Sequence, residues 1–146
     1  RATIELNLVA PFAIAQAAAV AMADHGIAGR IINVASIYAL AGIGRVPEAG
    51  YSASKGGLTS LTRELAAQWA RRDIRVNALA PGWFESEMTT TMFTEPRLVD
   101  WIGEKTPLRR TGAPHELDGA LLFLAGSASS FVTGIVLPVD GGWTAL

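Results

Sequence analysis

Three short apolar runs limit most strongly what this chain can fold into. They read RIINVAS (30–36), IRVNALA (74–80) and GIVLPVDGG (134–142), and helix-like segments stand between them. Strands that are apolar nearly throughout must be covered on both faces, which is typical of a parallel sheet with helices packed on each side. The sequence therefore predicts an α/β fold in the order α-β-α-β-α-β.

Helix signals occur before each of these runs. Strong helix formers fill residues 3–23, and the turn residues DHGIAG follow them. Apolar residues recur every three or four positions between 49 and 72, which marks an amphipathic helix. Pro114 suits the first turn of a third helix that continues to about residue 125.

The first helix contains the most apolar stretch of the chain, LNLVAPFAIAQAAAVAMA (6–23). Its length raises the question of a membrane span, but Asn7, Pro11 and Gln16 interrupt it and alanine dominates its second half. We therefore expect a buried helix rather than a membrane-spanning one.

The length and composition suit a single core. The chain has 146 residues, and 50% of them are hydrophobic. Residues 83–113 follow no single pattern, and a short helix is expected within them at about 96–105. We predict one domain over residues 1–146, with a lid inserted at about 83–113.

The charge and the cysteine content exclude several function classes. A net charge of −1 with scattered arginines gives no surface for nucleic acid. The absence of cysteine excludes disulfides and thiolate metal sites, and His25 and His115 lie far apart in the sequence. We expect a cytoplasmic protein without a metal site, a nucleic-acid partner or a membrane partner.

Polar and glycine residues gather where the three predicted strands end. Ser36 follows the first strand, Pro81-Gly82 ends the second, and Asp140-Gly141-Gly142 follow the third. In parallel sheets, ligands bind just beyond the carboxyl ends of the strands. The sequence therefore places a ligand site at this edge of the sheet, where the Ser36 hydroxyl can bond a substrate oxygen.

Tyr51 and Lys55 form the most specific chemical pair. The chain has two tyrosines and two lysines, so chance places one of each four residues apart only a few times in a hundred. Residues at this spacing share a helix face, and a nearby ammonium lowers the pKa of a phenol. Lys55 can thus make Tyr51 a usable proton donor or acceptor. Tyr38 has no such partner and is expected to be packing or a substrate wall.

Asn7 precedes Pro11 by four residues. Proline has no N–H, so the Asn7 carbonyl loses its helical partner and the helix should kink there. The freed carbonyl must bond water or a side chain, and a merely structural kink is the alternative.

These motifs together resemble the short-chain dehydrogenase/reductase family. The resemblance rests on Tyr51-x-x-x-Lys55 with Ser36 upstream, ELNL around Asn7, RVNALAPG and PVDGG, and it runs from Asn7 to Trp143. It implies a Rossmann-like doubly wound parallel sheet, present as three strands with flanking helices and a small lid. The family's Gly-rich first turn and its NNAG stretch do not occur among the 146 residues, so we expect the catalytic and C-terminal half of such a protein.

The resemblance also implies roles for single residues. Tyr51 would be the acid–base residue, Lys55 would hold the nicotinamide ribose and lower the tyrosine pKa, and Ser36 would orient the substrate. The backbone carbonyl of Asn7 would hold a water in a proton relay. The segment PGWFESEMT resembles the part of the family that closes over the nicotinamide, with Ser86 where threonine is usual. It implies cofactor contacts for Tyr51, Lys55, Pro81, Gly82, Trp83, Phe84 and Ser86.

The expected activity is therefore hydride transfer between NAD or NADP and a small-molecule carbonyl or secondary alcohol, in a homodimer or homotetramer. The choice between NAD and NADP and the identity of the substrate stay open. A serine hydrolase is disfavoured because no G-x-S-x-G surrounds Ser36. The rival from another class is a non-catalytic, oligomer-forming domain of the same fold, which a mean hydropathy of +0.31 supports.

Overall fold

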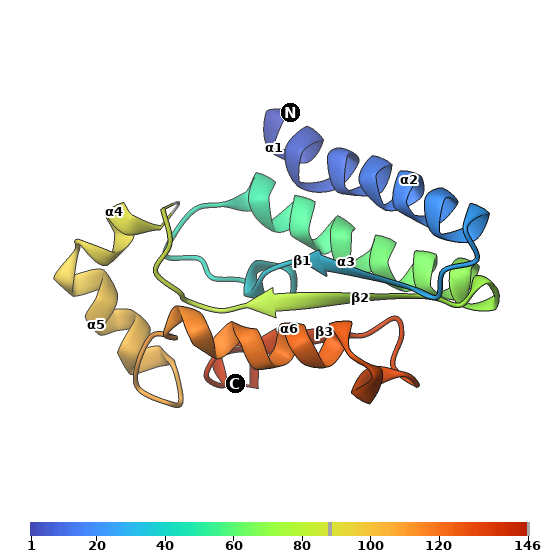
Figure 1. The fold of residues 1–146 in the computed structure, drawn as a ribbon. Helices are drawn as coiled ribbons and strands as arrows, with labels where there is room; N and C mark the ends of the chain where they lie inside the picture. The colour runs from blue at the N-terminus through green and yellow to red at the C-terminus, as the bar shows by residue number, and fades with distance from the viewer. Residues whose placement is uncertain (88, 146) are drawn as a thin grey trace.

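The computed structural model describes residues 1–87 and 89–145, and their fold is α/β (Figure 1). The strands form one sheet in the order β1-β2-β3, in which both neighbouring pairs are parallel. Their bounds are β1 Gly29–Val34, β2 Ile74–Pro81 and β3 Val136–Val139. Each strand coincides with one of the three apolar runs, which confirms the predicted parallel sheet.

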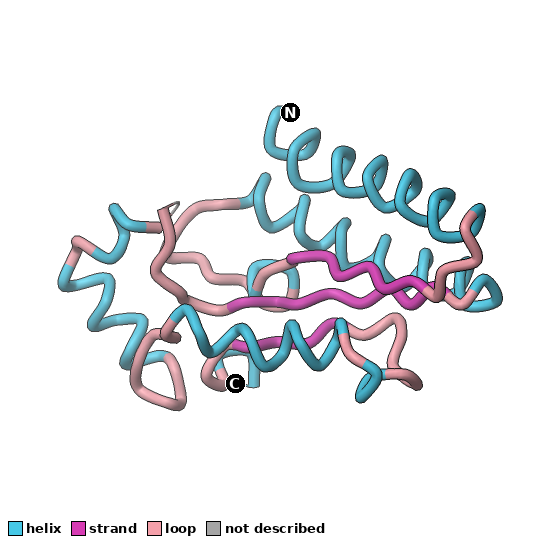
Figure 2. The backbone as a smooth tube through the Cα atoms, viewed as in Figure 1, coloured by secondary structure: helices cyan, strands magenta, loops and turns pink. Residues whose placement is uncertain are grey.

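The helices of the described residues cover both faces of this sheet. They are α1 Ala2–Ile4, α2 Ala10–Asp24, α3 Ala49–Trp69, α4 Thr90–Phe93, α5 Pro96–Lys105 and α6 Asp118–Ala125. α2 and α3 lie on one side of the sheet and α6 lies on the other (Figure 2). α4 and α5 lie beyond the carboxyl end of β2, within the segment predicted as a lid.

The main core lies between α2, α3 and the sheet. Alanines from α2 let this helix approach α3 and β1 closely, and larger side chains of α3 and β2 fill the core beside them. Its buried members are Ala15, Ala19, Leu65, Ala66, Trp69, Ile74 and Val76. This packing fixes the start of α3 relative to the ends of the strands.

Two buried asparagines lie within the strands that read as apolar. The Asn33 amide donates to the Thr62 hydroxyl at 2.9 Å. The Asn77 side chain donates to the Val132 carbonyl at 3.0 Å and accepts from the Ile135 N–H at 3.2 Å. Because both side chains are bonded, they can be buried at low cost.

The first helix is irregular at the position expected from Pro11. A π-helical turn spans Glu5–Val9, where the Ala10 N–H donates to the Glu5 carbonyl, and α2 begins immediately after it with Pro11 in its first turn. A proline that cannot donate to the Asn7 carbonyl accounts for this interruption.

The expectation that this helix is buried is wrong for the described residues. Only Ala15 and Ala19 of α2 are buried, while Leu6 and Ile14 are 73% and 69% exposed. The span Ala2–Asp24 is long and apolar enough to cross a membrane by length and composition alone, which is weak evidence. Apolar composition predicts that a helix packs against another surface, but it does not identify that surface.

Candidate active site

Ser36 lies two residues after the end of β1 and is almost fully buried. The backbone leaves the strand here in an extended conformation, and the Ser36 hydroxyl caps the following 3-10 turn, Ile37–Ala39. It accepts a hydrogen bond from the Tyr38 N–H at 3.3 Å. The capping bond holds the hydroxyl at the carboxyl end of β1, where the sequence predicted a ligand site.

Tyr51 and Lys55 lie near the start of α3, on the same face. The Lys55 Nζ lies 5.6 Å from the centroid of the Tyr51 ring, so the predicted pairing is confirmed. The ammonium also donates to the Val34 carbonyl at 2.8 Å, which ties α3 to the end of β1. Burial lowers the pKa of the Lys55 ammonium.

The pKa of Tyr51 departs from the sequence expectation. Burial raises it, a hydrogen bond with Ser36 lowers it, and the Glu48 carboxylate raises it, with a net increase above the ordinary value of 10.0. The expected net lowering by Lys55 is therefore wrong in this structure. The physical reason is desolvation, which disfavours the phenolate. Ser36 is the neighbour that favours the phenolate.

Asn7 reaches this site through Ser54. The Asn7 amide donates to the Ser54 hydroxyl at 3.3 Å, and this hydroxyl donates to the Tyr51 carbonyl at 2.6 Å. The interrupted first helix is thereby connected to the turn of α3 that carries the phenol. The relay role of the Asn7 carbonyl stays a prediction.

Aromatic rings border the site on the side of the lid. Tyr38 contacts Trp83 at 6.1 Å between ring centroids, and Trp83 contacts Trp143 at 5.5 Å and Trp101 at 6.3 Å. The Arg45 guanidinium lies 5.0 Å from the Trp101 ring centroid. This cluster could not be predicted from the sequence, because its members come from segments far apart in the chain. The only signal was that two of the four tryptophans, Trp83 and Trp143, directly follow the polar strand ends.

The residues after β2 do not all lie at the Tyr51 site. The Gly82 N–H donates to the Val139 carbonyl at 2.9 Å, and a Cβ at Gly82 would lie 2.7 Å from the Asp140 Cα. Pro81 ends β2, and Trp83 joins the aromatic rings beside Tyr38. This part of the predicted cofactor segment lies at the Tyr51 site.

Phe84 and Ser86 lie elsewhere. Successive side chains of an extended segment point in opposite directions, and Phe84 packs against Gly112 rather than with Trp83. The exposed Ser86 hydroxyl lies 3.0 Å from the Thr89 hydroxyl. The structure thus brings Asn7, Ser36, Tyr51, Lys55 and Trp83 toward one end of the sheet, and the cofactor contacts of Phe84 and Ser86 stay predictions.

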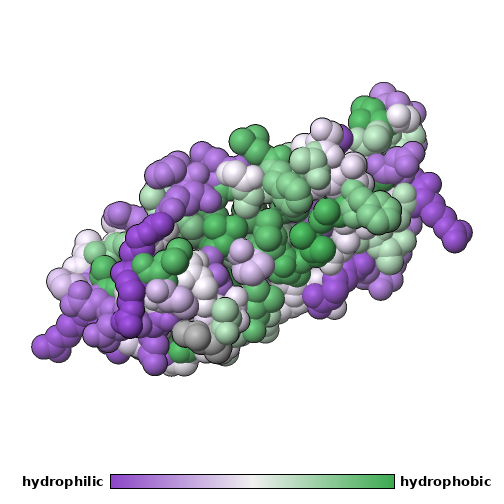
Figure 3. All heavy atoms as spheres, turned by 90° about the horizontal axis from the view of Figure 1, so that it is seen from below, coloured by the Kyte–Doolittle hydropathy of each residue, from purple (hydrophilic) through white to green (hydrophobic). Residues whose placement is uncertain are grey.

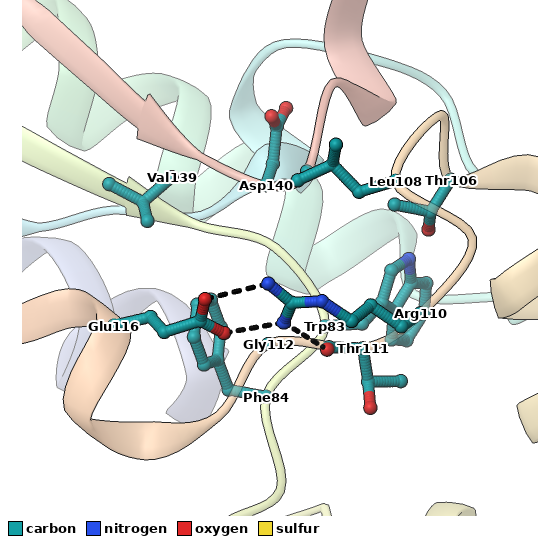
Figure 4. A pocket seen from close by; sticks show the side chains of 11 residues that line it. Trp83, Phe84, Thr106, Leu108, Arg110, Thr111, Gly112, Glu116, Val139 and Asp140 are labelled. Carbon is teal, nitrogen blue, oxygen red and sulfur yellow. Dashed lines mark hydrogen bonds and ion pairs between the residues drawn. The ribbon is translucent and has the colours of Figure 1, made fainter.

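Trp83, Phe84 and the end of β3 line a pocket of about 170 Å³ (Figure 4). Arg110 donates to both oxygens of Glu116, at 2.6 and 2.7 Å, and these bonds lower the pKa of the Glu116 carboxyl to about 2. Burial raises the pKa of Asp140, but hydrogen bonds from Thr144 and Gly142 outweigh it and leave the pKa below its ordinary value. The charged groups of this pocket are therefore already engaged.

Comparison with known proteins gives the family. A family model described as Enoyl-(Acyl carrier protein) reductase matches residues 1–144. Galactitol 2-dehydrogenase (L-tagatose-forming) of Cereibacter sphaeroides is 44% identical over 146 residues, which are 99% of this chain and 56% of that protein. The chain belongs to the short-chain dehydrogenase/reductase family.

Solved structures of this family share the fold. A gluconate 5-dehydrogenase from Burkholderia cenocepacia J2315, in complex with NADP and tartrate, is 42% identical with a TM-score of 0.91, covering 96% of this chain and 54% of that one. A 4-hydroxyisoleucine dehydrogenase complexed with NADH is 35% identical with a TM-score of 0.92, covering 98% and 58%. The chain thus spans little more than half the length of the short-chain dehydrogenase/reductases that it matches.

The residues of this family member fit the nicotinamide-ribose end of such a cofactor. An ammonium has three N–H donors, and the Val34 carbonyl is the one hydrogen-bond acceptor of Lys55 within residues 1–87 and 89–145. Two N–H donors thus remain available for a ligand with hydroxyl groups. Gly82 allows a close approach of β2 and β3 there, because a side chain at this position would meet Asp140.

Proposed function

We propose that these residues form the catalytic part of an NAD(P)-dependent oxidoreductase that interconverts a carbonyl and a secondary alcohol. The observation that supports it is the Lys55 ammonium 5.6 Å from the ring of Tyr51, together with Ser36, which lowers the pKa of this phenol, at the carboxyl end of β1. Two hydroxyls that converge at this edge of a parallel sheet can bind one substrate oxygen.

In the reduction, the carbonyl carbon gains a hydride and the carbonyl oxygen gains a proton. The nicotinamide cofactor, when bound, supplies the hydride. Tyr51 gives its phenolic proton to the oxygen, and Ser36 donates a hydrogen bond to the same oxygen. The raised pKa of Tyr51 keeps the phenol protonated at neutral pH, as a proton donor must be.

Lys55 and Asn7 serve this proton transfer. Lys55 holds the ribose hydroxyls and stabilises the phenolate that forms when Tyr51 has given up its proton. The Asn7 carbonyl, which Pro11 deprives of its helical donor, binds a water that returns a proton to Tyr51. In the oxidation, Tyr51 takes the proton from the alcohol.

The proposed substrate is a small polyhydroxylated carbonyl or alcohol compound. This rests on the names of the relatives, which act on galactitol and gluconate. The related structures contain NADP in one case and NADH in the other, so we propose either cofactor.

The decisive test is Tyr51→Phe in the full-length protein, assayed for cofactor-dependent oxidation of galactitol and gluconate. We expect turnover to fall by at least about a hundredfold, in the range known for loss of a general acid–base group. Tyr38→Phe is the matched control and should retain measurable turnover. Substantial turnover in a folded Tyr51→Phe protein would remove Tyr51 from the mechanism.

We also propose that the protein is a homodimer or homotetramer. α2 and α3 border an apolar groove, and α6 exposes leucines on the opposite side of the molecule, where apolar side chains gather in Figure 3. The groove residues include Leu8, Val9, Phe12 and Leu61. Light scattering measures the oligomeric state, and a monomer at micromolar concentration would contradict the proposal.

The rival, a non-catalytic assembly domain, is separated by a cofactor titration. The oxidoreductase binds NADH or NADPH, whereas the assembly domain forms oligomers without binding either. The Lys55 ammonium beside the Tyr51 ring, with Ser36 as the neighbour that favours the phenolate, favours the oxidoreductase.

A further inference from the structure

Glu48, Tyr51 and Lys55 lie along one face of α3. Glu48 is the N-cap residue of this helix, three positions before Tyr51, and Lys55 follows Tyr51 by four positions. Residues at these spacings share a helix face. The Lys55 ammonium lies beside the Tyr51 ring and donates to the Val34 carbonyl of β1. The phenol thus has an ammonium toward the next turn of the helix and a carboxylate toward the residue that precedes the helix.

The Glu48 carboxylate is accessible and makes no ion pair in the part of the chain that the structure describes. An N-cap side chain often bonds the free N–H groups of the first helical turn, but the Glu48 side chain makes no such bond. The ion pair found within residues 1–87 and 89–145 joins Arg110 to Glu116 instead. The oxygens of Glu48 are therefore available to a ligand.

The neighbouring cations in the sequence are engaged with other groups. The Arg45 guanidinium lies 5.0 Å from the centroid of the Trp101 ring, which belongs to α5. Such a contact is attractive and holds the cation over the ring. The Lys55 ammonium is bonded to the end of β1. The side of the Tyr51 site that Glu48 borders therefore carries a negative charge.

The charge of Glu48 acts on both phenols of the chain. Burial contributes most to the raised pKa of Tyr38 and of Tyr51, and Glu48 is the next cause that raises each pKa. The two rings are in contact with one another. Because salt screens exposed charges within about 10 Å, one carboxylate that acts on both phenols lies near both. Glu48 thus borders the space in front of the two rings.

The proposed reaction directs part of the substrate toward Glu48. The reacting oxygen is bonded to the hydroxyls of Ser36 and Tyr51, and the Lys55 side of the phenol is taken by the ribose of the cofactor. The groups next to the reacting carbon are then close to the Glu48 side. A carboxylate accepts hydrogen bonds from hydroxyl groups and repels a second carboxylate.

We infer that Glu48 is a specificity-determining residue that accepts hydrogen bonds from hydroxyl groups next to the reacting carbon, so that the site selects an uncharged polyol or ketose over a sugar acid. The inference rests on the proposed function, because that function places the substrate oxygen at Ser36 and Tyr51. It goes further by naming the charge of the substrate and the residue that reads it.

The test compares galactitol with galactonate, in which a carboxylate replaces one terminal hydroxymethyl group, as substrates of the full-length protein. The wild-type kcat/KM for galactitol should exceed that for galactonate by at least about tenfold, since a charged hydrogen bond is exchanged for repulsion. Glu48→Gln should reduce this ratio by at least about tenfold. Glu64→Gln is the matched control, because Glu64 lies on the same helix and bonds Gln68, and it should leave the ratio unchanged.

A second variant separates direct contact from a field effect. Glu48→Asp keeps the charge but shortens the side chain, so it should lower kcat/KM for galactitol if the carboxylate contacts the substrate. An effect of Glu48 that passes only through the pKa of Tyr51 would change kcat/KM for both compounds by the same factor. A wild-type ratio near one, a ratio that Glu48→Gln leaves unchanged, or full galactitol turnover in Glu48→Asp overturns the inference.

Calorimetry with galactitol and galactonate distinguishes this inference from the proposed function. Galactitol that binds more tightly to the wild type than to Glu48→Gln, but is oxidised with neither NAD nor NADP, would overturn the proposed function alone. Oxidation of both compounds at a ratio independent of Glu48 would overturn the inference alone. Binding of neither compound would also overturn the inference.

Discussion

The ring of Tyr38 meets the ring of Tyr51 edge to face, with centroids 5.4 Å apart and planes at 85°. The two phenols share one acidic neighbour, Glu48, which raises the pKa of both. Burial contributes most to each shift and raises the pKa of Tyr38 to about 12. Both phenols therefore remain neutral hydrogen-bond donors under ordinary conditions, although only Tyr51 has Ser36 and Lys55 beside it.

We predict that both tyrosines of the folded chain are less than half ionised at pH 10. The chain has only two tyrosines, so absorbance at 295 nm follows both, and the denatured chain should titrate near 10. Because folding raises these pKa values, their contribution to stability is present below pH 10 and is lost as the pH rises toward 12. A tyrosinate signal at pH 8–9 in the folded chain would contradict the raised pKa of both phenols.

Ser36→Ala should raise the pKa of Tyr51 further, because it removes the neighbour that favours the phenolate. The measurement uses a Tyr38→Phe background, in which Tyr51 is the only remaining phenol. Ser52→Ala is the control, since the Ser52 hydroxyl bonds the Tyr38 carbonyl rather than the Tyr51 phenol. An unchanged titration in Ser36→Ala would show that the two hydroxyls do not interact in solution.

Local patterns predicted the sheet, the long helix that carries Tyr51 and Lys55, and the interruption before Pro11. These features depend on spacings within short segments, so one sequence is sufficient to find them. The Asn33–Thr62 bond and the Trp83–Trp143 contact join segments more than 25 residues apart, which periodicity does not encode.

Two expectations were wrong because each depends on how deeply the residues are buried in the folded chain. The sequence indicates that the first helix needs cover, but Leu6 and Ile14 are exposed in the described chain. The spacing of Tyr51 and Lys55 brought the two side chains together, but desolvation outweighs any lowering of the phenol pKa. Spacing thus predicts proximity, and only burial determines the sign of the shift.

Gly82→Ala should destabilise the fold by about 1–3 kcal/mol through overpacking. The new Cβ would lie 2.7 Å from the Asp140 Cα, where backbone must move to make room. The matched control is Gly56→Ala in α3, whose Cβ meets nothing within 4 Å and should stabilise the helix by about 0.5–1 kcal/mol. Urea unfolding measures both, and equal effects would refute the close approach of β2 and β3.

Thr62→Val should cost about 1–3 kcal/mol of unfolding free energy, because it leaves the buried Asn33 amide without an acceptor. Thr59→Val is a close control. Both threonines are buried and both donate to a carbonyl of their own helix, but only Thr62 accepts a bond from the sheet. We expect Thr59→Val to cost less than about 1 kcal/mol.

A double variant with Asn33→Ala isolates the Asn33–Thr62 bond from other effects of either change. Once the amide is gone, the loss of the Thr62 hydroxyl leaves no donor unsatisfied, so the two changes together should cost less than the sum of the single changes. This bond joins the strand that leads to Ser36 with the helix that carries Tyr51. A coupling energy of zero would therefore mean that packing alone fixes the distance between the Ser36 and Tyr51 hydroxyls.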